Sequence, residues 1–264
     1  MICAGIDAGS RTTKIVLLDA DTLHVVAAAV VDQGVEQDAI AQTLLERLLH
    51  ESGLDRSQVA SIVATGYGRK LIHGAHETIT EITCQARGVR QRVPDARTII
   101  DIGGQDSKFL RLHENGTVAD FVMNDRCAAG TGRFLELVAM RLGVRLASLG
   151  ELAGKSQAPA MISSMCVVFA ETEIIGLLAS GVTTADIVAG VQASIAGRVA
   201  AMTGREVVSP IVLTGGVAMV PGMDAALHAA LGQPLHVAPK PQLTCALGAA
   251  MLAKRRLDGR KTST

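Results

Sequence analysis

The segment NDRCAAGTGRF (124–134) places a cysteine three residues before a glycine-rich turn that leads into an apolar stretch. Backbone N–H groups converge at such a turn, and the positive end of the following helix dipole adds to their field, so these sites attract anions. Cys127 can therefore pack as a small apolar residue, act as a nucleophile, or ligate an anionic group. The local sequence leaves the three alternatives open.

A second chemical pattern occurs twice, in GIDAGSRTTKIVLL (5–18) and IDIGGQDSKFLRL (100–112). Each segment runs from apolar residues to an Asp, reaches Gly two positions later and Lys seven positions later, as in Asp7 and Lys14 or Asp101 and Lys108. This spacing predicts a β-hairpin with a polar tip. Glycine lets phosphate oxygens approach the backbone, Lys adds charge, and the carboxylate suits Mg²⁺.

A single hairpin of this kind is more simply interpreted as an ordinary turn with solvated Asp and Lys side chains. The matched spacing of the pair instead favours a site that holds a nucleoside triphosphate from both sides. A third glycine turn follows an apolar strand in SPIVLTGGVA (209–218), where Gly215 and Gly216 lead to a helix expected near Met219 or Pro221. Neither a Walker A loop nor a dinucleotide-binding fingerprint is present in these segments. The three turns suit separate contacts with the phosphates and the nucleoside.

The elements that must position these residues follow from hydrophobic periodicity. The first half predicts strands near 2–6, 14–19, 24–31 and 60–64, with helices at about 37–52 and 79–91. Pro94–Asp95 is the predicted linker. The second half predicts strands near 98–102, 107–112, 117–122 and 210–213, with helices at 132–143, 166–180, 184–203 and about 243–256. The 94-residue offset between the two hairpins favours an α/β fold with two similar halves.

Composition narrows the function classes. Hydrophobic residues make up 48% of the 264 residues but aromatic residues only 2%, so the core is expected to consist of aliphatic side chains. Twenty-five basic and 25 acidic residues cancel, which gives no reason to expect nucleic acid or a membrane as partner. With neither a signal peptide nor a long apolar stretch apparent, we expect a cytoplasmic protein. The five cysteines, without a C-x-x-C pair, predict neither disulfides nor a zinc ribbon.

The hairpins and the TGG turn resemble those of the superfamily of sugar kinases, heat-shock ATPases and actin. A finer resemblance is to the BadF/BadG-type ATPases, and within them to activators of (R)-2-hydroxyacyl-CoA dehydratases. It is carried by ATGYGR (64–69), IDIGGQDSK (100–108), NDRCAAGTGRFLE (124–136), SSMCVVFAETEII (163–175) and LTGGVA (213–218). The resemblance implies two ribonuclease-H-like domains that close over ATP. Domain I would comprise residues 1–94 joined by the last helix (about 243–258), and domain II residues 95–242 with the cluster cysteines.

For the cysteines, the resemblance implies that Cys127 and Cys166 from each of two subunits hold one [4Fe–4S] cluster in a homodimer. A [4Fe–4S] cluster needs four thiolates, so two per chain require a two-fold partner. Cys127 is also expected to precede the helix at 132–143, and Cys166 to stand where the helix at 166–180 begins. The two helix N-termini would stabilise an anionic cluster. Cys3, Cys84 and Cys245 are interpreted as core residues.

The resemblance also implies a set of nucleotide contacts. Asp7, Asp101, Gln105 and Asp106 are the polar groups available for cleavage with Mg²⁺. The predicted ATP or ADP contacts are Ser10, Arg11, Thr12, Thr13, Lys14, Gly103, Gly104, Gly130, Thr131, Gly132, Glu136, Gly215, Gly216 and Gln242. For Glu136 (ribose) and Gln242 (adenine), the alternative is an ordinary exposed polar residue.

The function implied is ATP-driven transfer of one electron from a ferredoxin or flavodoxin to a partner acyl-CoA dehydratase or reductase. A first alternative is the ATPase subunit of a benzoyl-CoA reductase, although GGQD and NDRCAAGTGRF favour the dehydratase activators. A small-molecule kinase is a third hypothesis. It would need a substrate-binding insertion, for which 264 residues leave little room, and it would leave Cys127 and Cys166 without a role.

Overall fold

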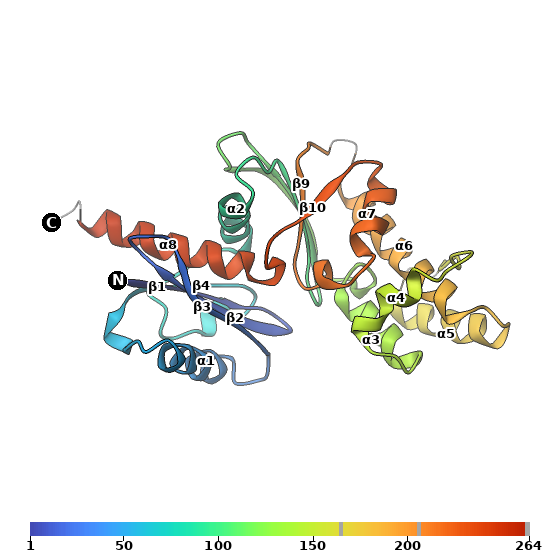
Figure 1. Ribbon diagram of the computed structural model, residues 1–264, viewed down its shortest axis with the longest axis horizontal. Helices are drawn as coiled ribbons and strands as arrows, with labels where there is room; N and C mark the ends of the chain where they lie inside the picture. Colours follow the sequence, from blue (N-terminus) through green and yellow to red (C-terminus); the bar gives the residue numbers. More distant parts are fainter. Residues whose placement is uncertain (164–165, 205–206, 262–264) are drawn as a thin grey trace. The chain divides into compact units, whose positions relative to one another are not determined.

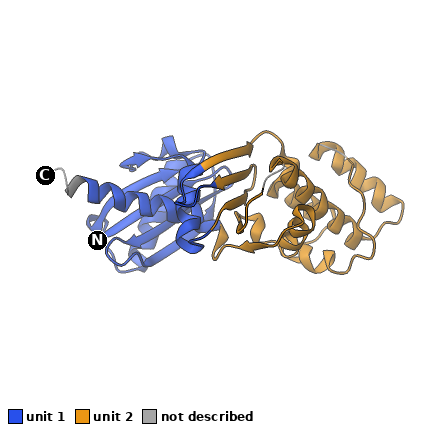
Figure 2. Cartoon of the chain, turned by 90° about the horizontal axis from the view of Figure 1, so that it is seen from above, with its two compact units in different colours: residues 1–95, 112–118, 242–264 blue, residues 96–111, 119–241 orange. Residues whose placement is uncertain are grey.

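Two five-stranded mixed sheets organise the chain (Figure 1). The structure is a computed structural model that describes residues 1–163, 166–204 and 207–261. It divides into two compact units (Figure 2). Unit 1 comprises residues 1–95, 112–118 and 242–264, and unit 2 comprises residues 96–111 and 119–241.

The sheet of unit 1 has the strand order β3-β2-β1-β4-β5. Its strands are β1 (Ile2–Ala8), β2 (Thr12–Asp19), β3 (Val25–Asp32), β4 (Val59–Thr65) and β5 (Glu77–Thr78). β1 pairs antiparallel with β2 and parallel with β4. Every residue of β1 is buried, because helices cover both faces of the sheet.

Alternate residues of β1 meet different helices. Ile2, Ala4 and Ile6 pack against α1 (Gln37–Glu51), whose leucines form the other side of that core. Cys3 faces α2 (Glu81–Arg92) and α8 (Thr244–Lys261), which cover the opposite face (Figure 1). Glycines let these backbones meet directly: a Cβ at Gly5 would overlap the carbonyl of Ala246, and one at Gly248 the carbonyl of Cys84.

The sheet of unit 2 has the order β10-β9-β6-β7-β8. Its strands are β6 (Thr98–Ile102), β7 (Ser107–Leu112), β8 (Val118–Asn124), β9 (Ile211–Thr214) and β10 (Leu235–Val237). Its helices are α3 (Gly132–Arg141), α4 (Leu149–Ala153), α5 (Val167–Ala179), α6 (Thr184–Met202) and α7 (Met223–Leu231). The stripe Ile187, Val191, Ile195 and Val199 of α6 recurs at four-residue spacing and packs in the same core as Ile100 and Leu213 of the sheet.

The predicted helices and strands are confirmed, with ends shifted by a few residues. The sequence did not predict β5, α4 or β10. The helix expected near Met219 or Pro221 begins at Met223, after a short 3₁₀ turn at Val217–Met219. Within the part of the chain that the structure describes, no helix is long and apolar enough to cross a membrane.

Candidate functional site

The tips of the β1–β2 and β6–β7 hairpins have the same backbone geometry. The N–H of Gly9 donates to the carbonyl of Thr12 (3.1 Å), and that of Gly103 donates to the carbonyl of Asp106 (2.9 Å). Asp7 pairs across the strands with Lys14, as Asp101 does with Lys108. The predicted duplication of the two hairpins is therefore confirmed in backbone register.

The ion pairs at the two tips differ. Lys14 Nζ lies 3.1 Å from Asp7 Oδ2, whose residue is only 6% exposed. Lys108 is buried and lies between two carboxylates, at 2.7 Å from Asp106 Oδ2 and 3.6 Å from Asp101 Oδ2. Asp101 Oδ1 also accepts a hydrogen bond from the Thr214 hydroxyl (3.0 Å). The carboxylate oxygens at the tip suit Mg²⁺, and the lysine suits phosphate.

Beside each Asp lies a Thr-Gly turn, and of the two turns the sequence analysis assigned only the second, through Gly215, to the site. Thr65 pairs in register with Asp7, and Thr214 with Asp101. The following glycines, Gly66 and Gly215, have φ of +88° and +89°, and a Cβ on either would overlap the neighbouring Asp side chain and strand carbonyl. The signal for the missed turn was available, because ATG (64–66) ends a strand as LTG (213–215) does.

The first tip exposes some of its predicted contacts and buries others. Arg11 is exposed, while Ser10 and Thr12 are half-buried. The Thr13 side chain is fully buried, and its hydroxyl donates to Gln33 Oε1 (3.0 Å). Gln33 Nε2 in turn donates to the carbonyl of Gly9 (3.0 Å). The hydroxyl of Thr13 is thus used to hold the tip, which leaves backbone N–H groups and the neighbouring side chains for a ligand.

The second tip is bonded directly to the loop that carries Cys127. The N–H groups of Gly132 and Arg133 donate to the carbonyls of Gly103 and Gly104, both at 2.9 Å. The buried Ser107 hydroxyl donates to the carbonyl of Gly130. These bonds bring the GGQDS segment and the predicted contacts Gly130 and Gly132 together within unit 2. Gln105, at the apex of the tip, is exposed.

Cys127 is exposed and precedes a single 3₁₀ turn, Ala128–Gly130. Asn124, the last residue of β8, brackets it: the Cys127 N–H donates to Asn124 Oδ1 (3.1 Å), and Asn124 Nδ2 donates to the Cys127 carbonyl (2.9 Å). The helix expected to follow this cysteine, α3, begins at Gly132 as predicted, five residues after Cys127. The N-terminal dipole of a regular helix is therefore not adjacent to this thiol.

Cys166 is also exposed and is the N-cap residue of α5. At this position the expected helix N-terminus is present, and backbone N–H groups of the first turn can stabilise an anion. Residues 164 and 165 of the second cysteine motif lie outside the described residues.

The remaining cysteines are in the core, as expected. Cys3, Cys84 and Cys245 are buried in unit 1, and burial raises the pKa of Cys3 to about 11 and that of Cys84 to about 12. A metal cluster needs thiolates, and burial disfavours the charged form. The donor set that fits an iron–sulfur cluster is therefore the exposed pair in unit 2. Among the described residues, no group of three or more His, Cys, Asp or Glu side chains is arranged to hold a metal ion.

Other predicted contacts are placed as follows. Glu136 forms an ion pair with Arg133 at 3.0 Å, so its carboxylate already has a cationic partner. Thr131 is buried, and its hydroxyl donates to the carbonyl of Ala128 (2.8 Å). Gly216 starts the short 3₁₀ turn after β9. Gln242 is half-buried and belongs to unit 1.

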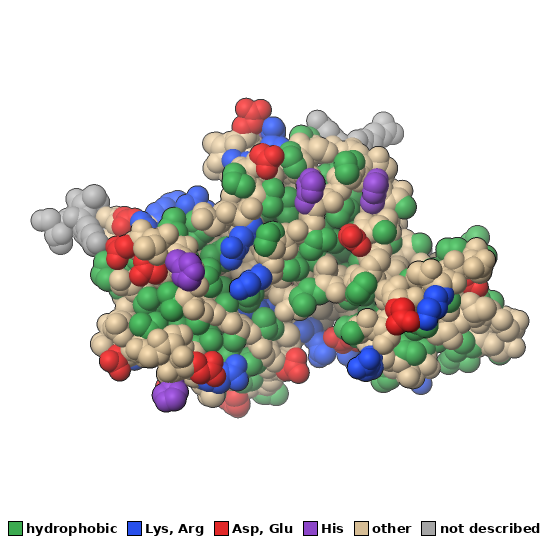
Figure 3. Space-filling model, viewed as in Figure 1, with side chains coloured by type: hydrophobic (Ala, Val, Ile, Leu, Met, Phe, Trp, Pro, Cys, Tyr) green, Lys and Arg blue, Asp and Glu red, His purple; other side chains and the backbone are tan. Residues whose placement is uncertain are grey.

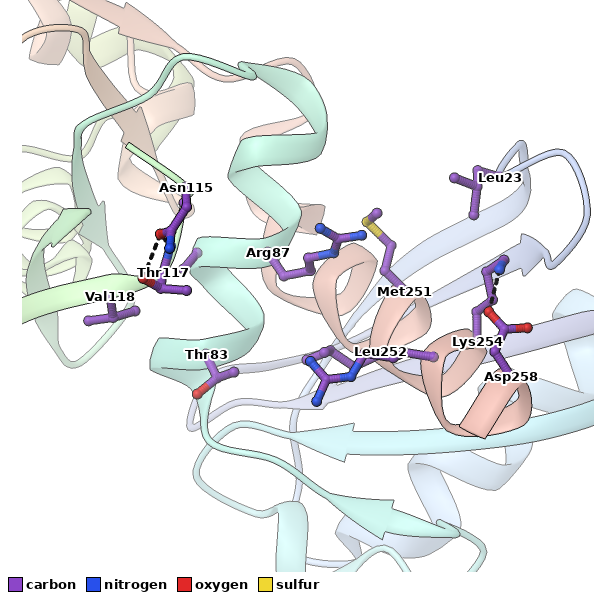
Figure 4. Close-up of a pocket in the computed structure, with 13 residues that line it drawn as sticks. Leu23, Thr83, Arg87, Asn115, Thr117, Val118, Met251, Leu252, Lys254 and Asp258 are labelled. Atoms are coloured by element: carbon purple, nitrogen blue, oxygen red, sulfur yellow. Dashed lines mark hydrogen bonds and ion pairs between the residues drawn. The ribbon is translucent and has the colours of Figure 1, made fainter. Parts of the chain in front are cut away.

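A cavity of about 500 Å³ lies elsewhere in unit 1, between α2, α8 and the tip of the β7–β8 hairpin (Figure 4). Arg87 and Met251 contribute to its wall, with the ion pair of Lys254 and Asp258 at one end. None of the predicted site residues lines it. On the face shown in Figure 3, acidic and basic side chains are interspersed with hydrophobic ones, in keeping with the balanced composition.

The chain is similar to known proteins over nearly its whole length. The profile of the BadF/BadG/BcrA/BcrD ATPase family matches residues 4–253. The activator of lactoyl-CoA dehydratase from Anaerotignum propionicum is 44% identical over 254 residues, covering 96% of this chain and 97% of that protein. One of the subunits of benzoyl-CoA reductase from Thauera aromatica is 33% identical over 235 residues, covering 86% and 82%.

Among solved structures, the activator of the 2-hydroxyisocaproyl-CoA dehydratase from Clostridium difficile with bound ADPNP superposes with a TM-score of 0.94. It is 40% identical and covers 100% of this chain and 98% of that chain. A ROK hexokinase from Thermus thermophilus, at 16% identity and a TM-score of 0.53, covers 98% and 100% and shares the fold alone. The predicted α/β fold, which this sugar kinase shares, is thereby confirmed.

Proposed function

The chain belongs to the BadF/BadG/BcrA/BcrD ATPase family, and from this premise we propose that it is an ATP-dependent one-electron transfer protein that activates a 2-hydroxyacyl-CoA dehydratase. One observation carries the proposal. In unit 2 a tip suited to phosphate and a loop with an exposed cysteine are joined by three hydrogen bonds. A phosphate-binding tip with no second function would not need a thiol in that place.

For nucleotide binding, we assign the phosphates of MgATP to the two hairpin tips. The backbone N–H groups and side chains of residues 9–14 and 103–106 are the donors, and Lys14 and Lys108 supply positive charge. Asp7 and Asp101 act on Mg²⁺, and Gln105 and Asp106 orient the attacking water. Gly215, Gly216, Glu136 and Gln242 are assigned to the nucleoside. This assignment keeps the predicted contacts, with Thr13 and Thr131 acting through their backbone because their hydroxyls are engaged.

For the redox group, we assign Cys127 and Cys166 of two copies of the chain as ligands of one [4Fe–4S] cluster, which supplies one-electron redox chemistry when bound. Large apolar side chains that lie within a few residues of each cysteine in the sequence are exposed. Val168 and Phe169, two and three residues after Cys166, are 68% and 69% exposed, and Phe121 of β8 is 49% exposed. Apolar surface of this kind is typical of a subunit contact, which supports a homodimer.

In this proposal the electron donor is a ferredoxin or flavodoxin and the acceptor is an acyl-CoA dehydratase. ATP can drive the transfer only if nucleotide binds the two conformations of the protein with different affinity. The second tip and the cysteine loop are the elements of this chain that would have to respond together.

A second candidate is the electron-activating ATPase component of a benzoyl-CoA reductase, which the 33% identity to the Thauera aromatica protein favours. This candidate ranks second because the chain is 44% identical to the activator of lactoyl-CoA dehydratase. A kinase function has only likeness of fold in its favour. The two leading candidates separate when reduced protein and MgATP are combined with each acceptor, because only the true partner becomes active.

The proposal is tested by iron analysis of protein purified without oxygen. We expect about four irons per dimer, because one [4Fe–4S] cluster is shared. Cys127→Ser and Cys166→Ser should each abolish the cluster, while Cys3→Ala, which changes a buried thiol of unit 1, should keep it. A full cluster in a strictly monomeric preparation would contradict the shared ligand set.

A further inference from the structure

We propose that Ser107 is a positioning residue: its hydroxyl ties the Cys127 loop to the second hairpin tip, so that nucleotide at the tip changes the reactivity of the Cys127 thiol. The inference rests on the proposed function in one respect, which is that the tip binds MgATP. It assigns a role to a residue that neither the spacing of the motifs nor the set of nucleotide contacts includes.

The contact itself is specific and shielded from water. Ser107 is 1% exposed and stands at the start of β7, one residue before Lys108. Its hydroxyl donates to the carbonyl of Gly130, which lies three residues after Cys127. A buried carbonyl that loses its donor retains its full desolvation cost, so the loop has a strong preference for the arrangement in which this bond is made.

Two backbone bonds act beside the hydroxyl, from Gly132 to the Gly103 carbonyl and from Arg133 to the Gly104 carbonyl. These acceptors belong to the tip itself. The space around Gly132 is narrow: a Cβ there would lie 3.2 Å from the Gly103 carbonyl oxygen and 3.2 Å from Val217 Cγ2. A shift of the tip therefore cannot leave the loop where it was.

On the other side, the loop holds Cys127 through Asn124, whose side chain bonds both the N–H and the carbonyl of the cysteine. The path from tip to thiol is thus a chain of contacts: tip to Ser107, Ser107 to Gly130, and the short turn Ala128–Gly130 to Cys127. A ligand that orders the tip should order the loop, and an ordered loop should expose the thiol less often.

The experiment uses the full chain after removal of iron, so that both thiols can be alkylated. Iodoacetamide is added with and without MgATP, and the rates at Cys127 and Cys166 are followed separately by peptide mass spectrometry. In the wild type, MgATP should slow the alkylation of Cys127 by about fivefold, the lower end of usual coupling between sites. Cys166 serves as the internal reference, since no hydrogen bond of the described residues joins it to the tip.

Ser107→Ala should bind MgATP but lose the difference at Cys127, and Ser107→Thr, which keeps a hydroxyl, should restore it. Threonine is accepted at the equivalent register position of the first hairpin, where Thr13 faces Ala8 as Ser107 faces Ile102. The matched control is Ser61→Ala. Ser61 is also a buried strand serine, but its hydroxyl has no hydrogen-bond partner among the described residues, so this variant should respond like the wild type.

Nucleotide binding is measured in parallel by calorimetry, which distinguishes a failure of the proposed function from a failure of the role assigned to Ser107. A wild-type chain that does not bind MgATP overturns the proposed function. A chain that binds MgATP with an unchanged Cys127 rate, or a Ser107→Ala variant that keeps the full wild-type change, overturns the role of Ser107 and leaves ATP binding intact.

Discussion

The two hairpins share a backbone and a charge pair but differ in what folds over them. In unit 1, the residue after β3 is Gln33, and its side chain joins the Thr13 hydroxyl to the Gly9 carbonyl. In unit 2, the segment after β8 is a loop that bonds the tip through its backbone and the Ser107 hydroxyl, and this loop carries Cys127. One tip is thus closed by an amide side chain, the other by a functional loop.

The difference indicates how a repeated element acquires a second role. The register of both hairpins places a hydroxyl residue, Thr13 or Ser107, next to the Lys and turned to the buried side. In the first copy the hydroxyl only stabilises its own tip. In the second copy the corresponding hydroxyl bonds the carbonyl of Gly130, in the loop that carries Cys127. A change at the tip can therefore reach Cys127.

The first prediction tests whether the two Thr-Gly turns support their hairpins equally. Gly66→Ala and Gly215→Ala should each lower the free energy of unfolding by about 3 kcal/mol or more, because positive φ and overlap with a strand carbonyl act together. The controls are Gly53→Ala in unit 1 and Gly143→Ala in unit 2. These glycines have φ of +65° and +64°, but a Cβ added to either would have no atom within 4 Å. The two control substitutions should cost only about 1 kcal/mol. Urea unfolding measures all four.

Equal losses in the four variants would show that the strain is only a matter of φ, and that neither turn presses on its Asp. A large loss at Gly215 and a small one at Gly66 would show that only the second hairpin depends on its neighbouring turn.

The second prediction concerns the carboxylates. Asp7→Asn and Asp101→Asn should each lower the kcat of MgATP hydrolysis by about 100-fold, as removal of a group that stabilises charge in the transition state does. Iron content should stay near that of the wild type, because the four ligands of the proposed cluster are thiolates and neither carboxylate is among them. Asp258→Asn, which changes a carboxylate paired with Lys254 on α8, is the control and should keep normal hydrolysis.

The two carboxylates lie against different lysines. Asp7 Oδ2 is 3.1 Å from Lys14 Nζ, and Asp101 Oδ2 is 3.6 Å from Lys108 Nζ, which also lies 2.7 Å from Asp106 Oδ2. Parallel loss of iron and hydrolysis in both variants would mean that these residues hold the fold and do not act on MgATP.

The third and smallest effect is expected from Gln33→Ala. Loss of two hydrogen bonds at the first tip should raise the dissociation constant of MgATP by at most about 30-fold, because two such bonds together contribute about 2 kcal/mol. The alkylation of Cys127 should still respond to saturating MgATP. If Gln33→Ala removed that response as Ser107→Ala is expected to, the two hairpins would not differ in the way described.

Much of this architecture could be predicted because its signals are local. The spacing from Asp to Gly to Lys fixes a hairpin without any distant contact, and the apolar periodicity of α1 or α6 is complete within the helix itself. By contrast, β5 has two residues and exists because Glu77 and Thr78 pair with Val63 and Ala64 of β4. No periodicity can be read from such a short segment.

The side-chain roles at the tips were harder to predict for the same reason. Alternation along β2 places Thr13 on the opposite side from Lys14, so its burial could have been predicted from the pleat. Its partner Gln33, and the partnership of Ser107 with Gly130, join residues about 20 positions apart. Such contacts depend on how the third strand of each sheet ends, and the sequence pattern does not determine this.

The glycine contacts between α8, β1 and α2 have a consequence for how unit 1 folds while the chain is being synthesised. The sheet of unit 1 is complete once β5 has left the ribosome, but α8, which covers the face with Cys3 and Val63, begins only at Thr244. At about 5–20 residues per second, translation leaves the part of this face that α8 covers exposed for roughly 10–40 seconds while unit 2 is made. During that time only α2 of the two covering helices is present, and the last helix to be translated completes the core of the first sheet.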